Sequence, residues 1–548
     1  MSTGATTATA APTVRPLRQR LREPRLRDAW VLAGVSGLLY SLVAVLQWRR
    51  FESPSWDLGI FTQLAKAYGN LEAPIVPIKG EGFNLLGDHF HPVLVLLGPL
   101  YRVFPSGLTL LIVQALLVAV SVVPLTRVAI DRLGRWPGVA AGAAYAFSFG
   151  IQGAVGAQFH EVAFALPLLG LSLEAFLRGR HLAAAVWAAP LVLVKEDLGL
   201  TVLVLGLVIA WRGTVRAGAA LAAWGLAWFV LATVVILPAL NPRGQWDYTD
   251  RLTLGDAVGD PLGTLADVLS PGEKVVTLLM LAAVAGVVGV RSPLVLAMVP
   301  TLAWRFLGNV PFYWGWTWHY NAVLMPVALA ALLDALGPRP DDEPPPSEEA
   351  PLDGVRAAEA PAGVQPPPKR EPPAVVEPPA DGSVPAPAGS APPADGSRAP
   401  AADAGARART PAAAHRTRAW LAVGVSLAVS LLATPDLALG RLTDADSYRP
   451  SPRHAAAAGA LDAVPDGVTV SSDIALIAYL VPTTTVYWSG NDGNPVPDYV
   501  VIDRLNGTWG GDAPADAAVY AEGKHPGTDY EVVYSESDYQ VARLVGAP

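Results

Sequence analysis

The sequence predicts an α-helical polytopic membrane protein with about 11 transmembrane helices and a small extracytoplasmic α/β domain at the C-terminus. The 548-residue chain is 52% hydrophobic and only 16% charged, whereas a soluble domain is about one quarter charged. Many of its apolar runs approach the roughly 20 residues needed to cross a bilayer. The chain has no cysteine, which excludes disulfides and thiolate metal sites.

The N-terminal residues predict the orientation of the chain. Residues 1–28 carry six arginines and no long apolar run, so we expect a cytoplasmic basic arm. The apolar run 29–47 is not followed by a small-residue cleavage site, which favours a retained anchor over a signal peptide. The positive-inside rule then places residue 48 outside a cell membrane that the chain crosses several times.

The transmembrane domain is expected to extend over residues 29–336, with one further helix at 418–434. After the first run, spans are expected at 107–130, 137–157, 161–178, 182–194, 198–211, 217–238, 275–290, 293–308 and 319–336. The connectors that this count assigns to the cytoplasm carry the arginines Arg127, Arg132, Arg135, Arg178, Arg180, Arg212, Arg216 and Arg291.

Two of these runs, 182–194 and 198–211, are shorter than a spanning helix and flank the charged triplet Lys195, Glu196 and Asp197. A single helix through both would move Arg212 and Arg216 outside. We therefore expect two short helices that meet near the outer face. Charges at membrane depth cost several kcal/mol unless they are paired or face water, so this triplet indicates a functional site. Residues 93–104 are also too short to span and predict a surface or re-entrant helix.

The remaining segments are a linker and a soluble domain. Residues 337–417 are rich in proline and alanine and predict a disordered cytoplasmic linker. Residues 450–548 predict an extracytoplasmic α/β domain without a glycine-rich phosphate loop. Its expected elements are strands at 467–473, 484–488 and 499–503, a short helix at 474–480, and a closing hairpin made of 531–534 and 539–545.

The helix count places the unusual polar residues on one side of the membrane. They lie in the motifs WDLGIFTQ (56–63), GDHFHP (87–92), QFHE (158–161), KED (195–197) and YWGWTWHYN (313–321), with an arginine shortly before the last motif. The candidate site residues are Asp57, His89, His91, His160, Glu161, Lys195, Glu196, Asp197, Arg305 and His319.

Each motif also has a structural interpretation. Asp57 could cap the helix that follows it, and Glu161 could cap the next one. His89 and His91 suit a metal or a phosphate, or they are solvated loop residues. Lys195 and Glu196 could form a structural ion pair. The tryptophans between 314 and 318 are typical of an interfacial belt.

Together these motifs resemble the membrane-protein family known as domain of unknown function 2079, over most of residues 50–335. The matching features are the segment from Asp57 to Gln63, the GxHFxP segment, the Pro-Ser turn at 105–106, QFHE, KED and the WxHY segment. The family is grouped with the GT-C-type glycosyltransferases. This resemblance implies a GT-C-like transmembrane fold and a catalytic acid in the first outer loop, which is Asp57 here; it is an analogy of fold.

The resemblance implies that the protein moves a sugar from a polyprenyl-phosphate donor to a glycan, lipid or protein acceptor at the outer membrane face. Asp57 would be the base. Lys195, Arg305, His89 and His91 would contact the phosphate, and Glu196 and Asp197 would orient Lys195. A divalent cation, Mg²⁺ or Mn²⁺, would be the cofactor, with His89, His91, Glu196 and Asp197 as candidate ligands. The expected partners are membrane lipids, and no feature indicates nucleic acid. The alternatives are a transporter or lipid flippase, and a non-catalytic scaffold.

Overall fold

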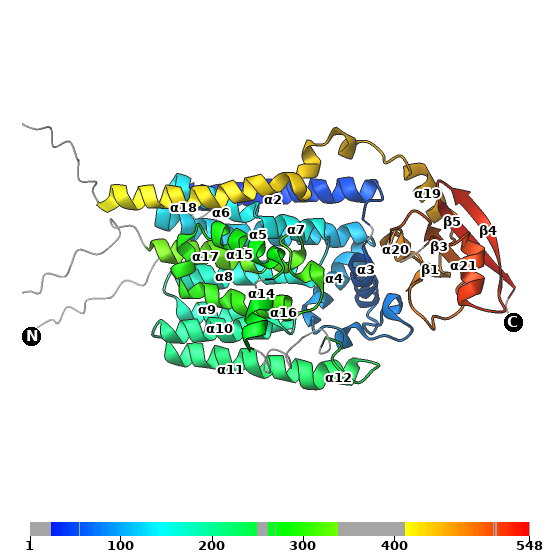
Figure 1. Cartoon of the computed structure of the whole chain (residues 1–548), viewed down its shortest axis with the longest axis horizontal. Coiled ribbons are helices and arrows are strands. Elements are labelled where there is room, and N and C mark those ends of the chain that lie inside the picture. Colours follow the sequence, from blue (N-terminus) through cyan, green and yellow to red (C-terminus); the bar gives the residue numbers. More distant parts are fainter. Residues whose placement is uncertain are drawn as a thin grey trace, which may run out of the picture.

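Helices that run side by side make up most of the protein, and a five-stranded sheet lies beyond one end of them (Figure 1). The structure is a computed structural model. It describes residues 24–53, 55–248, 261–268, 270–337, 411–507, 509 and 512–546. Most of the expected basic arm and of the expected linker therefore lies outside the described residues.

Six helical segments are long and apolar enough to cross a membrane, counted over the part of the chain that the structure describes. They are Pro24–Arg49, Gly107–Leu133, Arg135–Gly156, Val215–Leu240, His319–Leu336 and Ala413–Asp436. The 27 residues of the second segment would extend about 40 Å at 1.5 Å per residue, which exceeds the hydrocarbon core of a bilayer. The protein is thus a mainly helical membrane protein with a small C-terminal sheet domain.

The helices of the N-terminal part follow the expected apolar runs closely. Their bounds are α2 Pro24–Arg49, α3 Trp56–Gly69, α4 Leu97–Val103, α5 Gly107–Leu133, α6 Arg135–Ala146, α7 Phe149–Gly156, α8 Ala165–Leu177, α9 His181–Ala188, α10 Leu198–Trp211, α11 Val215–Leu231 and α12 Leu237–Leu240. The later helices are α14 Pro261–Val268, α15 Gly272–Val284, α16 Val299–Leu307, α17 Leu324–Leu336 and α18 Pro411–Ala433. The last of these begins seven residues before the expected 418.

The two short runs around Lys195 form a hairpin, as the arginine pattern predicted. α9 continues as a 3-10 turn, Ala189–Leu193, and α10 then returns. The ring Nδ1 of His181, at the start of α9, lies 2.6 Å from the hydroxyl of Thr214, just beyond the end of α10. Both ends of the hairpin therefore lie at the same end of the helical bundle, and Lys195 lies at its tip.

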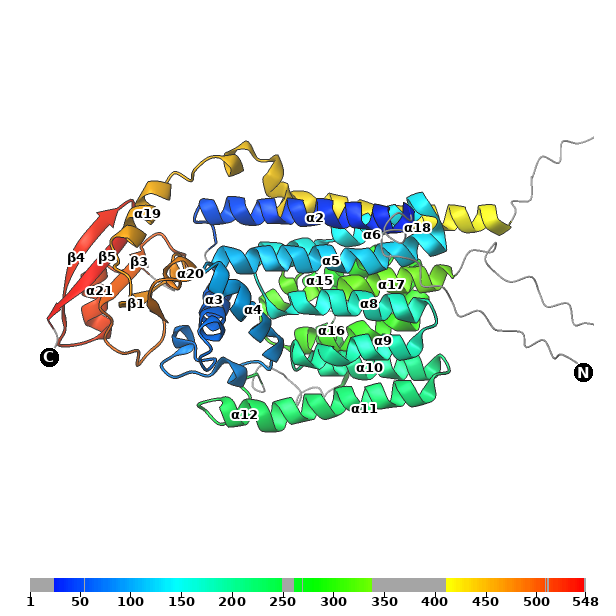
Figure 2. The same ribbon diagram turned by 180° about the vertical axis from the view of Figure 1, so that it is seen from behind.

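Ion pairs join the helix ends at this basic end of the bundle. Asp131 at the end of α5 accepts from Arg25 at 2.9 Å and from Arg178 at 2.7 Å. Arg212 after α10 pairs with Asp334 of α17 at 2.6 Å. The arginine-bearing connectors thus gather at one end of the bundle, and we name the opposite end, which carries α3 and the C-terminal domain, the site end (Figure 2). Which side of a membrane the site end faces stays a prediction.

The C-terminal domain contains a mixed sheet in the order β2-β1-β3-β5-β4. Its strands are β1 Thr469–Ser472, β2 Thr485–Trp488, β3 Tyr499–Asp503, β4 Asp529–Glu536 and β5 Tyr539–Gly546, and its helices are α19 His454–Asp462, α20 Ile477–Leu480 and α21 Ala517–Lys524. The first three strands are parallel, and β5 runs antiparallel to both β3 and β4. All five expected strands and the short helix are present, whereas α19 and α21 were not predicted.

Candidate functional site

Asp57 lies in the first turn of α3, at the site end of the bundle. The helix begins at Trp56, and the Ser55 hydroxyl caps it by accepting from the backbone N–H of Leu58 at 3.1 Å. Asp57 is therefore not the N-cap, and its carboxylate is free for another role. The side chain is 49% exposed, and its Oδ2 lies 3.4 Å from Nε2 of His160. The first turn of a helix also favours a negatively charged side chain.

His160 is buried behind Asp57 and is held from several directions. Its backbone N–H donates to the side-chain oxygen of Gln114, and its ring Nδ1 lies 3.2 Å from the carbonyl oxygen of Gln158. Because a carbonyl only accepts, this contact is a hydrogen bond when Nδ1 carries the hydrogen, and Nε2 is the ring nitrogen that faces Asp57. The ring stacks on His319 with centroids 3.5 Å apart.

The backbone before His160 is strained. Gln158 has a φ of +72°, in the left-handed region that non-glycine residues seldom adopt. Such strain persists where surrounding contacts fix it, and it is concentrated at functional sites. Here it turns the QFHE segment so that His160 faces Asp57 while Glu161 points toward the α9–α10 hairpin.

Glu161 and the hairpin tip form two further acid–base pairs. Glu161, 2% exposed, lies 2.8 Å from the Lys195 ammonium. Glu196 lies 2.7 Å from Nδ1 of His89 and also accepts the backbone N–H of Phe90 at 3.0 Å. Lys195 and Glu196 therefore do not pair with each other, and Glu161 caps no helix. His160 is next to Glu161 in the sequence, and Lys195 is next to Glu196, so the three pairs form one continuous cluster. We name this cluster the charged chain; its members are Asp57, His160, Glu161, Lys195, Glu196 and His89.

The charged chain continues to a pair that was not predicted. Asp88 lies 3.1 Å from the Lys79 ammonium, and the Tyr248 ring stacks on His89 at 4.5 Å. Burial alone would raise the pKa of Asp88, but the positive charges of His89 and Lys79 lower it below its usual value. Burial and Lys195 act to lower the pKa of His89, yet the Glu196 carboxylate offsets both and the pKa is raised. The pair of His89 with Glu196 is thus favoured in its charged form.

The other predicted residues have distinct surroundings. His91 is buried edge-on against Phe61, and burial lowers its pKa to about 4, so it is neutral at physiological pH. Asp197 is partly buried at the hairpin tip, and its Oδ1 has no hydrogen-bond partner among the described residues.

Arg305 is fully buried and holds the 313–321 segment in place. Its guanidinium donates to the carbonyl oxygens of Tyr313 and Gly315, each at 2.8 Å, and to Oδ1 of Asn321 at 2.9 Å. That segment carries His319, which stacks on His160. This segment lies close against α7 because Gly153 has no side chain there. A Cβ at Gly153 would lie 2.5 Å from the carbonyl oxygen of Thr317. Arg305 thus acts on the site indirectly, because it holds the segment that carries His319.

The expected metal site requires several ligand side chains close together. Within the described ranges, no three His, Asp or Glu side chains are grouped so that they could hold a metal ion. The carboxylates of the charged chain face basic partners instead. The expected Mg²⁺ or Mn²⁺ stays a prediction.

The C-terminal domain packs directly on α3, which the sequence did not predict. The Trp488 ring of β2 lies 5.1 Å from that of Trp56, next to Asp57. Gln63 donates to the carbonyl oxygen of Val486 at 3.0 Å, and the Lys66 ammonium donates to that of Val481 at 2.8 Å. Apolar residues of α3 and of the sheet share one buried core, in which Ile477 contacts Gly59. The domain therefore fixes the helix that carries Asp57.

The sequence motifs identified every residue of the charged chain except Lys79 and Asp88. Asp88 lies inside the GDHFHP motif and could have been selected. Lys79 and Tyr248 lie in loops without any recognisable pattern, so only the fold brings them to the site.

Comparison with known proteins gives one finding about this region. No curated protein and no solved structure matches the chain. A family model described as "Predicted membrane protein (DUF2079)" matches residues 48–347. The match covers more than half of the chain and includes all the predicted site residues. The protein therefore belongs to this family of predicted membrane proteins.

Proposed function

We propose that the protein is a membrane glycosyltransferase, GT-C-like in its architecture, that moves a sugar from a polyprenyl-phosphate donor to an acceptor hydroxyl. The observation that carries the proposal is the pairing of a half-exposed carboxylate, Asp57, with a buried imidazole, His160, at the end of a bundle of apolar helices. Such a site can reach both a polyprenyl chain and a water-soluble acceptor. The side of transfer is proposed to be the outer face of the cell membrane.

In the proposed reaction, Asp57 takes the proton of the acceptor hydroxyl, and the oxygen of that hydroxyl attacks the anomeric carbon of the sugar. The bond from that carbon to the phosphate oxygen breaks, and polyprenyl phosphate leaves with the bonding electrons. General bases of this kind contribute about 10²–10⁴-fold to a rate. His160 positions Asp57 and can accept the proton at Nε2.

The leaving phosphate requires nearby positive charge. Lys195 is proposed to supply it, since its ammonium belongs to the charged chain and can exchange Glu161 for a phosphate oxygen. Lys79 is proposed as a second cation of the site, since its ammonium lies over the ring of Trp56, the residue before Asp57, at 4.9 Å. Arg305 and His91 are proposed to support the site, because the first is saturated by the 313–321 segment and the second is neutral.

The proposal is tested with the purified full chain in detergent or nanodiscs, incubated with labelled polyprenyl-phosphate sugars and a membrane extract as acceptor source. Transfer of label to a product that no longer partitions with the donor supports the proposal. EDTA added to a matched reaction reports whether a divalent cation takes part. Movement of the labelled lipid across a vesicle without any product would replace the transferase by a flippase.

A further inference from the structure

Tyr320 follows His319 in the sequence and extends the stack of rings behind Asp57. Its ring centroid lies 4.0 Å from that of His319, which in turn stacks on His160 at 3.5 Å. Tyr320 also lies within electrostatic range of Lys195 and Asp57. The phenol therefore belongs to the same site as the charged chain.

Two aromatic rings hold the ring of Tyr320 in place. Trp304 and Tyr313 meet it edge-on, with centroids at 5.5 Å and 5.1 Å and interplanar angles of 84° and 80°. Arg305, whose guanidinium carbon lies 5.9 Å from the same ring, binds the backbone of this segment. A donor that is fixed in this way needs little reorganisation when a ligand binds.

The hydroxyl of Tyr320 is available to a ligand. The side chain is only partly buried, and its hydroxyl forms no hydrogen bond within the part of the chain that the structure describes. The Lys195 ammonium has three N–H donors, and among the described residues its ion-pair partner is Glu161, at 2.8 Å. Both groups can therefore donate to one further acceptor.

The chemistry of these two donors selects the class of acceptor. A further cation would pair with the carboxylate of Asp57 or Glu161, as Lys195 does, whereas a neutral phenol stays unpaired beside them. Hydrogen bonds to an ionised acceptor are about twice as strong as those to a neutral one. Cleavage of a polyprenyl-phosphate sugar turns a phosphodiester into a phosphomonoester, which carries more negative charge at neutral pH. The donors therefore suit the leaving phosphate better than a neutral sugar hydroxyl.

We propose that Tyr320 donates a hydrogen bond to a phosphate oxygen of the polyprenyl-phosphate donor, while Lys195 supplies positive charge to the same phosphate; this role rests on the proposed function. The bond from the anomeric carbon to the phosphate oxygen breaks, its electrons stay on that oxygen, and the phenol keeps its proton throughout. The hydrogen bond strengthens as the leaving phosphate gains charge. Tyr320 therefore favours both the binding of the lipid phosphate and its departure from the sugar.

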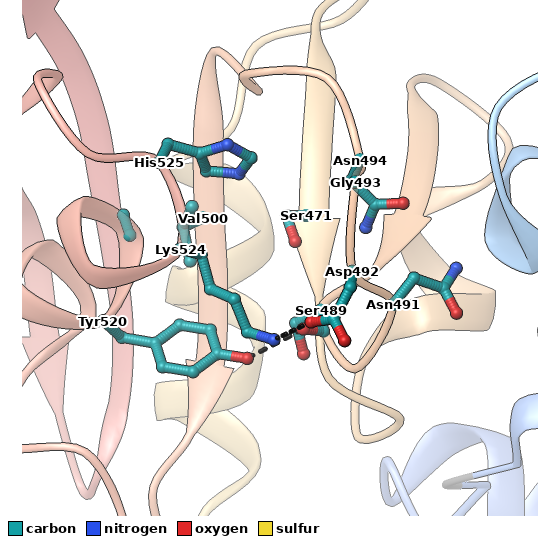
Figure 3. A pocket seen from close by; sticks show the side chains of 11 residues that line it. Ser471, Ser489, Asn491, Asp492, Gly493, Asn494, Val500, Tyr520, Lys524 and His525 are labelled. Atoms are coloured by element: carbon teal, nitrogen blue, oxygen red, sulfur yellow. Dashed lines mark hydrogen bonds and ion pairs between the residues drawn. The ribbon is translucent and has the colours of Figure 1, made fainter.

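A lysine and a tyrosine also lie together in the C-terminal domain, at a pocket between its sheet and α21 (Figure 3). There the Tyr520 hydroxyl already donates to the Ser489 carbonyl oxygen at 2.8 Å, and the Lys524 ammonium lies 3.1 Å from Oδ1 of Asp492. The cavity has a volume of about 40 Å³, which leaves room for ordered water only. Tyr520 is thus a matched control, a tyrosine whose hydroxyl is not available to a lipid phosphate.

The test titrates the purified full chain in detergent with sugar-free polyprenyl phosphate and, separately, with uncharged polyprenol, and measures the bound lipid by native mass spectrometry. Tyr320→Phe keeps the ring and removes only the hydroxyl. It is expected to bind polyprenyl phosphate about tenfold more weakly, as for one lost hydrogen bond to a charged group, and to bind polyprenol as the native protein does. Tyr520→Phe should bind both lipids with native affinity. Thermal unfolding verifies that each variant is folded.

The outcomes separate the role of Tyr320 from the function of Asp57. Native affinity of Tyr320→Phe for polyprenyl phosphate would overturn the proposed hydrogen bond, and so would an equal loss for polyprenol, which would indicate a structural role of the hydroxyl. Absence of polyprenyl-phosphate binding by the native protein would overturn it as well. Phosphate binding that depends on Tyr320 while no sugar transfer is ever observed would leave the phosphate site and remove the transferase.

Discussion

Glu161 and Lys195 show how residue-level contacts refine a motif. Lys195 was selected because charges are costly at membrane depth, and Glu161 because it lies in the polar QFHE motif, but the sequence could not name their partners. Lys195 and Glu196 are adjacent and invite a local pair, yet Lys195 contacts Glu161 and Glu196 contacts His89. Partner choice depends on how α8, the hairpin and the outer loop pack together, which a linear pattern does not contain.

The first prediction concerns this buried pair. Glu161→Gln leaves the Lys195 charge without its partner and is expected to destabilise the protein by about 3–5 kcal/mol, as for other broken buried pairs. The double variant Glu161→Gln with Lys195→Met removes both charges and should recover most of that loss. Thermal unfolding of the detergent-solubilised protein measures it.

Additive losses in the double variant would show that the two groups do not depend on each other. Arg441 and Glu52 form an exposed ion pair at 2.7 Å, and Arg441→Met is the control. Exposed pairs contribute about 0–1 kcal/mol, so that variant should unfold close to the native temperature.

Individual elements were predictable where hydropathy alone defines them. The hairpin around 195–197 was predicted because the arginine pattern allowed only one topology, and the contact of His181 with Thr214 agrees with it. By contrast, the docking of α3 against β2 involves residues more than 400 positions apart in sequence, such as Gln63 and Val486. No local pattern marks that contact.

The second prediction addresses this docking. Trp488→Ala removes the ring that packs on Trp56 and is expected to loosen α3 from the sheet. Hydrogen exchange of residues 56–69 should become about tenfold faster, the equivalent of about 1.4 kcal/mol. Exchange of α11, far from the docking surface, should not change.

Trp420→Ala provides the matched comparison, since Trp420 is an exposed tryptophan of α18. It should leave exchange in residues 56–69 as in the native protein. Unchanged exchange in Trp488→Ala would mean that the C-terminal domain does not fix α3.

At the scale of the whole molecule, fold class and family region were predictable from composition and motifs, whereas the relation between the two domains was not. Hydropathy reports which segments avoid water but not which of their ends meet. The count of about 11 spans also exceeds the six segments that meet length and hydropathy requirements in the described residues. Short helices such as α9 and α10 account for part of the difference, because tertiary packing can bury them without full spanning length.

The third prediction is a pH dependence of the C-terminal domain. Asp473 is 4% exposed, and burial raises its pKa to about 7 although it accepts the backbone N–H groups of Asp503 and Ala475. The folded domain therefore holds this proton more tightly than the unfolded chain does. Its contribution to stability is full below about pH 4 and falls as the pH rises to about 7, by up to about 4 kcal/mol.

Comparison with Asp473→Asn isolates this group, because asparagine carries no charge at any pH. The stability of the native protein relative to the variant should decline from pH 4 to pH 7.5, measured by hydrogen exchange of β1 and β3 in the full chain. A difference that is constant over this range would show that Asp473 does not titrate there.

The central claim is that Asp57 acts as the base of a sugar transfer. Its most direct test is the initial rate of label transfer from polyprenyl-phosphate sugar, measured in Asp57→Asn and in the control variant Glu273→Gln. Glu273 is an exposed acidic residue in the first turn of α15, so its amide variant matches the change in charge and helix position. We predict a loss of about 10²–10⁴-fold in Asp57→Asn with a native thermal unfolding curve, and a native rate in Glu273→Gln. Transfer by Asp57→Asn at the native rate would contradict the account.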